Sequence, residues 1–349
     1  MRVVLLPSVR HGASAFGPRV DFIETARILG GEILYPPGGR GAWARLEAAT
    51  SLDFRQAFAA WRMPRETLFL SLSEKVALPL ALLDRHRRPH LLIAHHLSSP
   101  RKRTLQRQTG VLSRFSRIVV LSGEQHRYLE NEARVPPERI VRWHHHADTL
   151  FWRPAEPETV TEAVPVAARP EEGRPYLVAV GKERRDYATL MTALEKMPEY
   201  RCILVAGSAW TGDRTGPLRV PPNVERRGAI DWGTLRELYR GATAAVVPLE
   251  AGTRYAAGST ALLEAMAVGR PTIVTETPGI ADYTIAAQTV PAGDADALAS
   301  VLRTLLTDPE ATARLERAGR AWVTEHASLD RYVASLTELV TSEVRRSMF

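Results

Sequence analysis

The chain alternates short apolar runs with longer amphipathic stretches, and this alternation constrains its fold more than any other feature. Runs such as RVVLLP, HLLIAH and RIVVLS have the length and the β-branched composition of buried strands. Stretches with helical periodicity separate them, as at residues 20–29, 54–61 and 76–86. Strand, helix and strand at this spacing predict a parallel, doubly wound α/β sheet with right-handed crossovers.

The alternation is interrupted once, by residues 154–175, which are rich in Pro, Glu, Ala and Val and indicate a linker. A second alternation begins at Tyr176 with YLVAVG, and a length of 349 residues exceeds what one core usually organises. We therefore predict two Rossmann-like domains, residues 1–165 and 166–327, followed by a C-terminal helix at residues 328–349.

Composition narrows the class of protein. A hydrophobic content of 45% supports globular cores, and no apolar run reaches the ~20 residues that a membrane span needs. The N-terminal run MRVVLLP turns polar too early for a secretion signal and reads as a first strand. The single cysteine, Cys202, excludes an internal disulfide and lies in the apolar run CILVAG. We expect an inert core thiol and a cytoplasmic protein.

The net charge of +7 is compatible with binding to nucleic acid, to an anionic membrane surface or to a phosphorylated small molecule. The sequence contains no recognisable nucleic-acid-binding module. Arg101, Lys102 and Arg103 form a basic run at a helix start, which could bind an acceptor phosphate or make peripheral contact with anionic lipid. A solvated helix face is the commoner role of such a run.

Residues 255–279, YAAGSTALLEAMAVGRPTIVTETPG, are the most informative about function. A loop turns into a helix at Gly258, Ser259 and Thr260, and the free N–H groups of a first helical turn attract anions such as phosphate. The predicted helix covers residues 260–268 and stops at Gly269. Glu264 lies one turn inside it, within reach of a ligand whose phosphates bind the helix start.

The run LLEAMAVGRPTIVT followed by PGI resembles the donor-nucleotide motif of glycosyltransferase family 4, the retaining enzymes of GT-B architecture. The resemblance implies two Rossmann-like domains facing across a cleft, with the final helix crossing back to the first domain. It implies a nucleotide-sugar donor whose diphosphate binds the helix start and whose ribose hydroxyls bind Glu264. No metal ion or other cofactor is expected.

A second segment, VGKERRDYATLMTAL, is similar to the place where that family carries two cations that clamp the donor phosphates. Lys182 follows Gly181 as the first cation does, and Arg185 aligns with the second, although the spacing is two residues shorter. Whether Arg184 or Arg185 faces the donor is left open, and a solvated charge cluster is the alternative. The resemblance also places Gly228 near the nucleotide base.

The chain departs from the family pattern just before the donor motif. The family has paired glutamates, and the position of the first is occupied by Ala256. Glu250 and Arg254 are near enough in sequence to substitute for it. The recognition of the donor sugar is therefore left open.

In the first half, the loop HGASAFG, with Gly12 and Gly17, follows the first strand and is a candidate donor-binding loop, although a plain loop is the alternative. His95 and His96 end the strand HLLIAH, where family members commonly place a histidine facing the donor sugar. Neighbours in a strand point to opposite sides, so the sequence does not separate the two.

Three adjacent histidines, His144, His145 and His146, suggest a metal site, but adjacent side chains diverge and no carboxylate or cysteine has ligand spacing. The run HHADTLFWRP instead resembles the hinge signature of the family, with Asp148, Phe151 and Pro154 marking the exit from the first domain.

These patterns predict a retaining glycosyltransferase that moves a sugar from a nucleotide diphosphate donor to a small acceptor, such as a specialised metabolite. The expected catalytic groups are His95, His96, Lys182 and Arg185. A nucleotide-sugar epimerase of the same fold and a non-catalytic sugar-nucleotide binder are the alternatives. Turnover of a donor panel with and without acceptor separates the three.

Overall fold

The computed structural model describes residues 1–10, 16–84, 88–155, 175–206 and 219–347. The chain divides into two compact units, each built on its own sheet. Unit 1 comprises Met1–Ala13, Arg19–Trp143 and Asp330–Phe349, and unit 2 comprises Ser14–Pro18 and His144–Leu329. The domain boundary expected at residues 165–166 lies outside the described residues, within 156–174.

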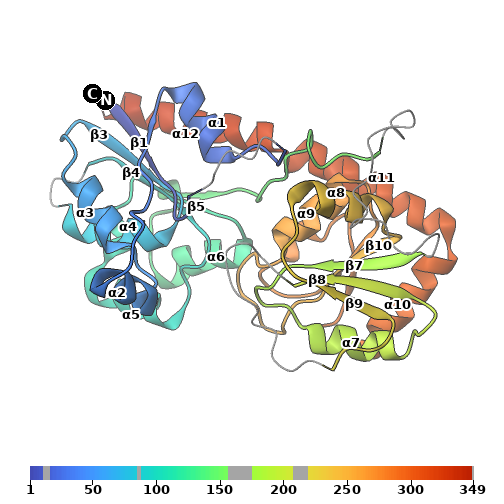
Figure 1. The fold of residues 1–349 in the computed structure, drawn as a ribbon. Coiled ribbons are helices and arrows are strands. Elements are labelled where there is room, and N and C mark those ends of the chain that lie inside the picture. The colour runs from blue at the N-terminus through green and yellow to red at the C-terminus, as the bar shows by residue number, and fades with distance from the viewer. Residues whose placement is uncertain (11–15, 85–87, 156–174, 207–218, 348–349) are drawn as a thin grey trace. The chain divides into compact units, whose positions relative to one another are not determined.

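Unit 1 is built on a six-stranded parallel sheet with the order β2-β1-β3-β4-β5-β6 (Figure 1). The strands are β1 (Arg2–Leu6), β2 (Glu32–Ile33), β3 (Thr67–Ser71), β4 (His90–Ala94), β5 (Arg117–Val120) and β6 (Ile140–Arg142). Every residue of β3 and β4 is buried, because the crossover helices cover both faces of a parallel sheet. The parallel sheet predicted from the apolar runs is confirmed.

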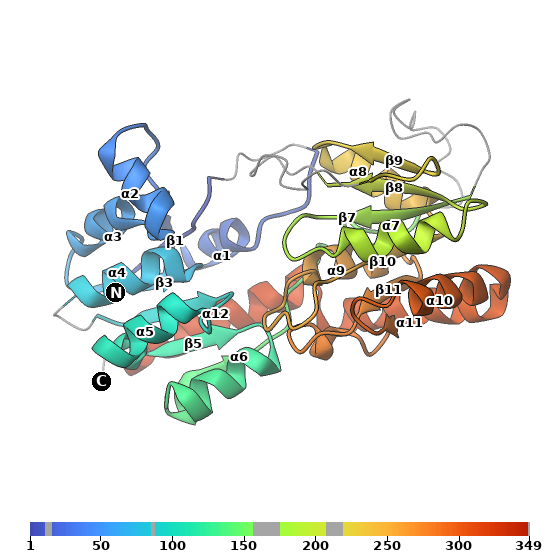
Figure 2. The same ribbon diagram turned by 90° about the horizontal axis from the view of Figure 1, so that it is seen from below.

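The helices of unit 1 are α1 (Asp21–Leu29), α2 (Ala42–Thr50), α3 (Phe54–Trp61), α4 (Glu74–Leu83), α5 (Pro100–Thr109), α6 (Gly123–Arg127) and α12 (Leu329–Arg346). Helix α2 was not predicted from the sequence. None of its residues is buried, and it lies beside α3 (Figure 2). A helix without a buried face has no apolar periodicity by which to recognise it.

The final helix, α12, belongs to unit 1, as the fold prediction expected. Leu336 and Val340 on this helix are fully buried. Near its start, Arg19 Nη1 lies 2.7 Å from Asp330 Oδ1, which ties the helix to the segment before α1. Residues at the two ends of the chain therefore stabilise the same unit.

Unit 2 contains a second six-stranded parallel sheet with the order β12-β11-β10-β7-β8-β9. Its strands are β7 (Tyr176–Val180), β8 (Arg201–Val205), β9 (Val224–Arg227), β10 (Ala244–Val247), β11 (Thr272–Thr275) and β12 (Gln288–Val290). With β7 counted as the first strand, the order reads 6-5-4-1-2-3, which is the Rossmann order. The strand order reverses between β7 and β10, and ligands bind beyond the carboxyl ends of strands at such a point.

The helices of unit 2 are α7 (Tyr187–Glu195), α8 (Trp232–Gly241), α9 (Ser259–Ala267), α10 (Ala295–Thr307) and α11 (Pro309–His326). Four of them begin at an aspartate whose carboxylate accepts a backbone N–H at the third residue on; these are Asp186, Asp231, Asp294 and Asp308. Helix α9 differs, because nearly all of its residues are buried and no side chain caps it.

Candidate functional site

The loops after β7 and β10 are joined where the strand order of unit 2 reverses. Arg185 and Leu249 form an antiparallel bridge. On either side of it, the N–H of Asp186 donates to Pro248 O over 3.1 Å, and the N–H of Glu250 donates to Arg184 O over 3.0 Å. These bonds place residues 181–186 beside the loop that leads into α9.

Arg185 lies at the start of α9 and is fixed by the backbone around it. Its Nε donates to Val180 O (3.1 Å) and its Nη1 to Glu183 O (2.8 Å). A Cβ atom at Gly181 would lie 2.5 Å from Arg185 Nη2, and one at Gly258 would lie 3.5 Å from Nη1. The guanidinium therefore lies close to the backbone of both glycines. Both also have a positive φ, 110° and 89°, which side chains rarely adopt.

The start of α9 is left open to an anion. Gly258 occupies the N-cap position, and no side chain of the described residues caps the helix. The Ser259 hydroxyl does not cap the helix, since it donates to Ala256 O over 2.8 Å. Thr260 is exposed. The first N–H groups of a helix have no acceptor within it and carry a partial positive charge.

Glu264 lies one turn further along α9 and is 6% exposed. Burial raises its pKa to about 8, although a hydrogen bond from Tyr239 and the charge of Arg185 act in the opposite direction. The Tyr239 hydroxyl donates to Glu264 Oε2 over 3.4 Å. Tyr239 is itself buried, with 1% of its surface exposed. The Tyr239 ring packs edge-on against Trp152, with 5.8 Å between the ring centres.

The structure separates the two neighbouring arginines. Arg184 has a left-handed backbone, with φ at 54°, and its Nη1 donates to Glu250 Oε2 over 2.8 Å. Its guanidinium thus binds a carboxylate, whereas that of Arg185 lies at the helix start. Glu250 is exposed and engaged in this pair, and Ala256 packs against the core of unit 2.

The remaining residues predicted to bind the donor are Lys182, Gly228, Gly12 and Gly17. Lys182 follows Gly181 directly and is half-buried. Gly228 is exposed in the loop between β9 and α8, with open space where a side chain would stand. Gly12 lies outside the described residues, and Gly17 is half-buried.

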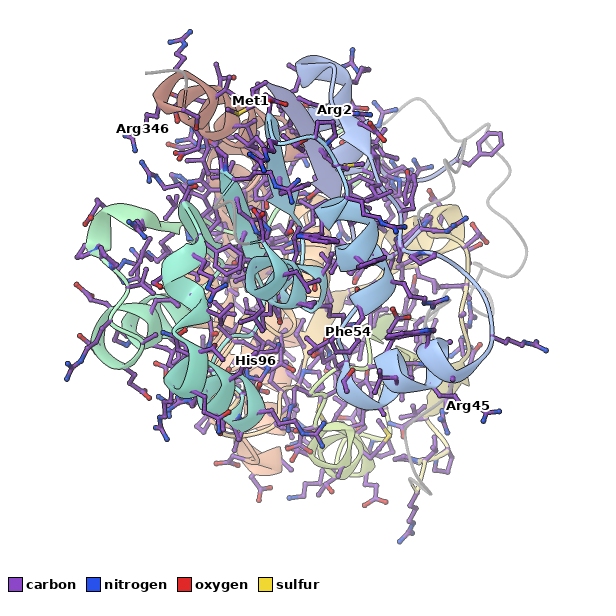
Figure 3. All side chains as sticks on the ribbon, turned by 90° about the vertical axis from the view of Figure 1, so that its left-hand side faces the viewer. Met1, Arg2, Arg45, Phe54, His96 and Arg346 are labelled. Carbon is purple, nitrogen blue, oxygen red and sulfur yellow. The ribbon has the colours of Figure 1, made fainter. Side chains whose placement is uncertain are left out.

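In unit 1, His95 and His96 form the turn that follows β4. His95 is exposed and His96 is half-buried. The Nε2 of His95 lies 3.1 Å from the carbonyl oxygen of Leu72, and a carbonyl only accepts, so Nε2 carries the proton. Figure 3 shows the labelled His96 at the opposite end of unit 1 from Arg2, as the parallel strands require.

Two buried side chains that the sequence analysis missed hold this turn. Glu74, at the start of α4, is 5% exposed, and Gln125 in α6 is 1% exposed. Glu74 accepts the N–H groups of His95 and His96, both over 3.2 Å. The available signal was positional: both residues closely follow a buried strand, where parallel sheets gather polar groups.

The basic run at α5 is not a uniform charged face. Lys102 Nζ lies 2.6 Å from Glu74 Oε1. Arg103 Nε donates to Ser98 O over 2.8 Å, and its guanidinium lies 4.9 Å from the centre of the Tyr128 ring. Only Arg101 of the three is exposed. Among the described helices, none is long and apolar enough to cross a membrane.

The three adjacent histidines, His144, His145 and His146, pack against aromatic rings and against each other. The His144 ring lies edge-on to Tyr283 at 5.3 Å and to Trp322 at 5.0 Å, and the rings of His145 and His146 stack at 4.9 Å. Within the described ranges, no three His, Cys, Asp or Glu side chains are grouped so as to hold a metal ion. Asp148 is buried and accepts the N–H of Leu150 over 3.2 Å.

Comparison with known proteins supports this fold. A family model described as glycosyl transferases group 1 matches residues 161–322. Anabaena HepE in complex with UDP superposes with a TM-score of 0.74 at 17% identity, covering 98% of this chain and 100% of that one. Sucrose-phosphate synthase from Thermosynechococcus elongatus gives 0.72 at 18% identity, covering 98% and 99%.

An α,α-trehalose-phosphate synthase (UDP-forming) from Burkholderia xenovorans, in complex with glucose-6-phosphate, gives a TM-score of 0.72 at 10% identity, covering 99% of this chain and 100% of that one. No curated protein matches the sequence. The likeness over almost the full length, with two Rossmann-like sheets, shows the predicted GT-B fold.

Proposed function

We propose that this chain is a retaining glycosyltransferase that moves a sugar from a nucleotide diphosphate donor to a small acceptor. The observation that carries the proposal is the position of the Arg185 guanidinium against Gly181 and Gly258, at the uncapped start of α9. A fixed cation beside a helix N-terminus is suited to a diphosphate. Glu264, one turn further along the helix, would accept hydrogen bonds from the ribose hydroxyls in this proposal.

The proposed chemistry follows from where charge develops. Cleavage of the bond between the sugar and the phosphate leaves negative charge on the departing diphosphate. Arg185, Lys182 and the first N–H groups of α9 would stabilise that charge without reorganising. We propose that the acceptor attacks on the same face that the diphosphate leaves, so the anomeric configuration is retained. The leaving phosphate takes the proton of the acceptor, and no side-chain nucleophile is needed.

Uridine diphosphate sugars are the first donors to test, because the HepE structures are described as complexes with UDP and with UDP-glucose. We propose that turnover is independent of divalent metal, since the cation and the helix start supply the positive charge. Dialysis against EDTA should therefore leave donor turnover unchanged. A loss that Mg²⁺ or Mn²⁺ restores would contradict this part of the proposal.

Arg185→Ala tests the proposal directly. Removing one charge-stabilising donor from a transition state typically lowers kcat by about 10²–10³-fold. Arg184→Ala is the matched control, because it removes the neighbouring guanidinium, which binds Glu250. We expect Arg184→Ala to stay within about threefold of wild type, as a surface ion pair contributes little. Equal turnover of both variants would refute the proposed role of Arg185.

A panel of UDP-, GDP-, ADP- and dTDP-sugars, each with and without acceptor extracts, separates the remaining alternatives. A glycosyltransferase requires an acceptor for fast turnover. Without one, it releases free sugar only slowly, by hydrolysis of the donor. Conversion of one nucleotide sugar into another without acceptor would indicate an epimerase. Binding without turnover under all conditions would indicate a non-catalytic binder.

A further inference from the structure

A polar pocket of about 520 Å³ lies in unit 1, at the amino ends of the strands β5 and β6. It is lined by the end of α5, by the residues that lead into the two strands, and by α12, and all of these belong to unit 1. The turn after β4 lies at the other edge of this parallel sheet. The volume falls within the range of about 300–1,000 Å³ that is typical of small-molecule sites.

Three arginines line this pocket, and neutral groups hold them. The Nη1 atoms of Arg114, Arg117 and Arg139 each donate to a backbone carbonyl oxygen, over 2.9, 2.7 and 2.9 Å. A carbonyl fixes a guanidinium without cancelling its charge, and each guanidinium carries five N–H donors. By contrast, Arg55 and Arg88 of the same unit are paired with carboxylates at 2.6 and 3.2 Å.

Glu343, on α12, contributes a carboxyl group to the pocket and is 8% exposed. Among the described residues its Oε2 has no hydrogen-bond partner, and Arg117 Nη1 lies 3.9 Å from it, beyond hydrogen-bond distance. A buried polar atom without a partner is uncommon in folded proteins and calls for an explanation such as a bound water, ion or ligand. Three guanidinium groups thus meet one carboxyl group, so the described lining carries a net charge of at least +2 (three minus one).

Two hydroxyl groups of the lining are oriented by the backbone. Thr109 Oγ1 donates to Leu105 O over 2.7 Å, and Ser113 Oγ donates to Gly110 O over 2.8 Å. A hydroxyl has a single proton, so these two oxygens are left as acceptors towards a ligand. The arginines of the pocket therefore suit an anion, whereas its hydroxyl oxygens suit the hydroxyl groups of a polyol.

We propose that this pocket binds a small phosphorylated polyol, with the phosphate held by the guanidinium groups of Arg114, Arg117 and Arg139. A phosphate dianion matches the excess of positive charge, and planar guanidinium groups bind phosphate oxygens in pairs. The oxygens of Thr109 and Ser113 accept hydrogen bonds from the polyol. The site is separate from the start of α9, and the inference does not depend on the proposed glycosyltransferase function.

Calorimetric titration of the full-length protein with glycerol 3-phosphate at pH 8 is the main test, because the phosphate group is then a dianion. Inorganic phosphate and glycerol are the matched probes. We expect glycerol 3-phosphate to bind, inorganic phosphate to bind at least about threefold more weakly because it lacks the polyol hydroxyls, and glycerol not to bind. Equal affinity for inorganic phosphate would overturn the polyol assignment, and no binding of either phosphate compound would overturn the site.

Arg139→Gln and Arg114→Gln locate the binding within the protein. Each variant removes one charged donor and should weaken the binding of glycerol 3-phosphate by about tenfold or more. Arg114 is exposed, so its variant serves if Arg139→Gln folds poorly. Arg101→Gln is the matched control, because Arg101 is an exposed arginine of the same unit that lies outside this lining. It should keep its affinity within about twofold, and an equal loss in this control would mean attraction by net charge alone and would overturn the site.

Two more variants separate this pocket from the start of α9, which also attracts phosphate. Arg185→Gln should leave the affinity for glycerol 3-phosphate unchanged. A loss of binding in Arg185→Gln that Arg139→Gln does not share would place the ligand at α9 and overturn the proposal. Glu343→Gln removes the opposing charge and should tighten binding by about threefold or more. Weaker binding by Glu343→Gln would contradict the assignment of a phosphate to this pocket.

Discussion

At the residue scale, Glu264 combines burial with a site that we propose for the nucleotide ribose. Burial raises its pKa to about 8, so the carboxyl is largely protonated in the free protein at neutral pH. Ribose hydroxyls donate hydrogen bonds, and an ionised carboxylate accepts them best. Donor binding should therefore be coupled to loss of a proton from Glu264.

We predict that UDP-glucose binds more tightly as the pH rises from about 7 to 9, with release of a proton, because binding favours the ionised form. Glu264→Gln should weaken binding by about tenfold or more and abolish the pH dependence. Calorimetry in buffers of different ionisation enthalpy measures both quantities. UDP-glucose has no phosphate that titrates in this range. Binding by wild type without net proton exchange would contradict the prediction.

The same pKa gives a stability prediction of definite sign. Between its unfolded value of 4.5 and its folded value of about 8, Glu264 is protonated in the folded state and ionised in the unfolded state. Its contribution is therefore full below the unfolded value and is lost as the pH rises towards 8. Thermal unfolding should show Glu264→Gln gaining stability relative to wild type over this range. A constant difference between the two proteins would be inconsistent with a raised pKa.

At the element scale, the start of α9 depends on glycine for two separate reasons. Gly258 has φ at 89°, and a Cβ there would lie 2.9 Å from a methyl group of Leu249 and 3.0 Å from one of Val247. Gly252, in the loop before it, has φ at 72° but nothing within 4 Å. Both glycines have a positive φ, which would strain any other residue, but only Gly258 is crowded.

Gly258→Ala should lower the free energy of unfolding by about 1–3 kcal/mol from strain, with crowding in addition, and should weaken UDP-glucose binding by about tenfold because the helix start is displaced. Gly252→Ala should carry a similar strain but keep its affinity within about twofold. Denaturant titration and calorimetry give the two values for each variant. Equal losses of affinity would show that strain alone, rather than displacement of α9, controls the site.

At the scale of the whole molecule, the main crossing into unit 2 follows β6, and the chain returns to unit 1 in its final helix. Leu302 in α10 and Leu336 in α12 are both fully buried, but the first belongs to unit 2 and the second to unit 1. Cys202 is the only cysteine and is buried in β8 of unit 2. Burial raises the pKa of its thiol to about 12, so it should react only when unit 2 opens.

Leu302→Ala and Leu336→Ala should each destabilise their own unit by about 2–5 kcal/mol, as expected for a buried leucine replaced by alanine. Labelling of Cys202 by a thiol reagent under native conditions should accelerate in Leu302→Ala and remain near the wild-type rate in Leu336→Ala. Hydrogen exchange should show the complementary loss of protection in β1 and β3–β6 for Leu336→Ala. Equal acceleration of labelling would mean that the two units open together.

The sequence by itself determined the α/β class and most of the strands, because these depend on local periodicity. It also indicated the helix start at Gly258 and the stop at Gly269, since glycine adopts backbone conformations that other residues avoid. It did not predict α2, which buries no residue and therefore has no apolar periodicity.

Only the tertiary structure distinguished Arg185 from Arg184, because the loop from β10 pairs with both residues and directs their side chains to different partners. Only the structure revealed Glu74 and Gln125, which are distant in sequence from the turn they hold and meet it because β3, β4 and β5 are neighbours. The burial of Glu264 was likewise decided by packing around α9. Local patterns fix the elements, whereas the polar contacts of a site depend on which strand ends the sheet brings together.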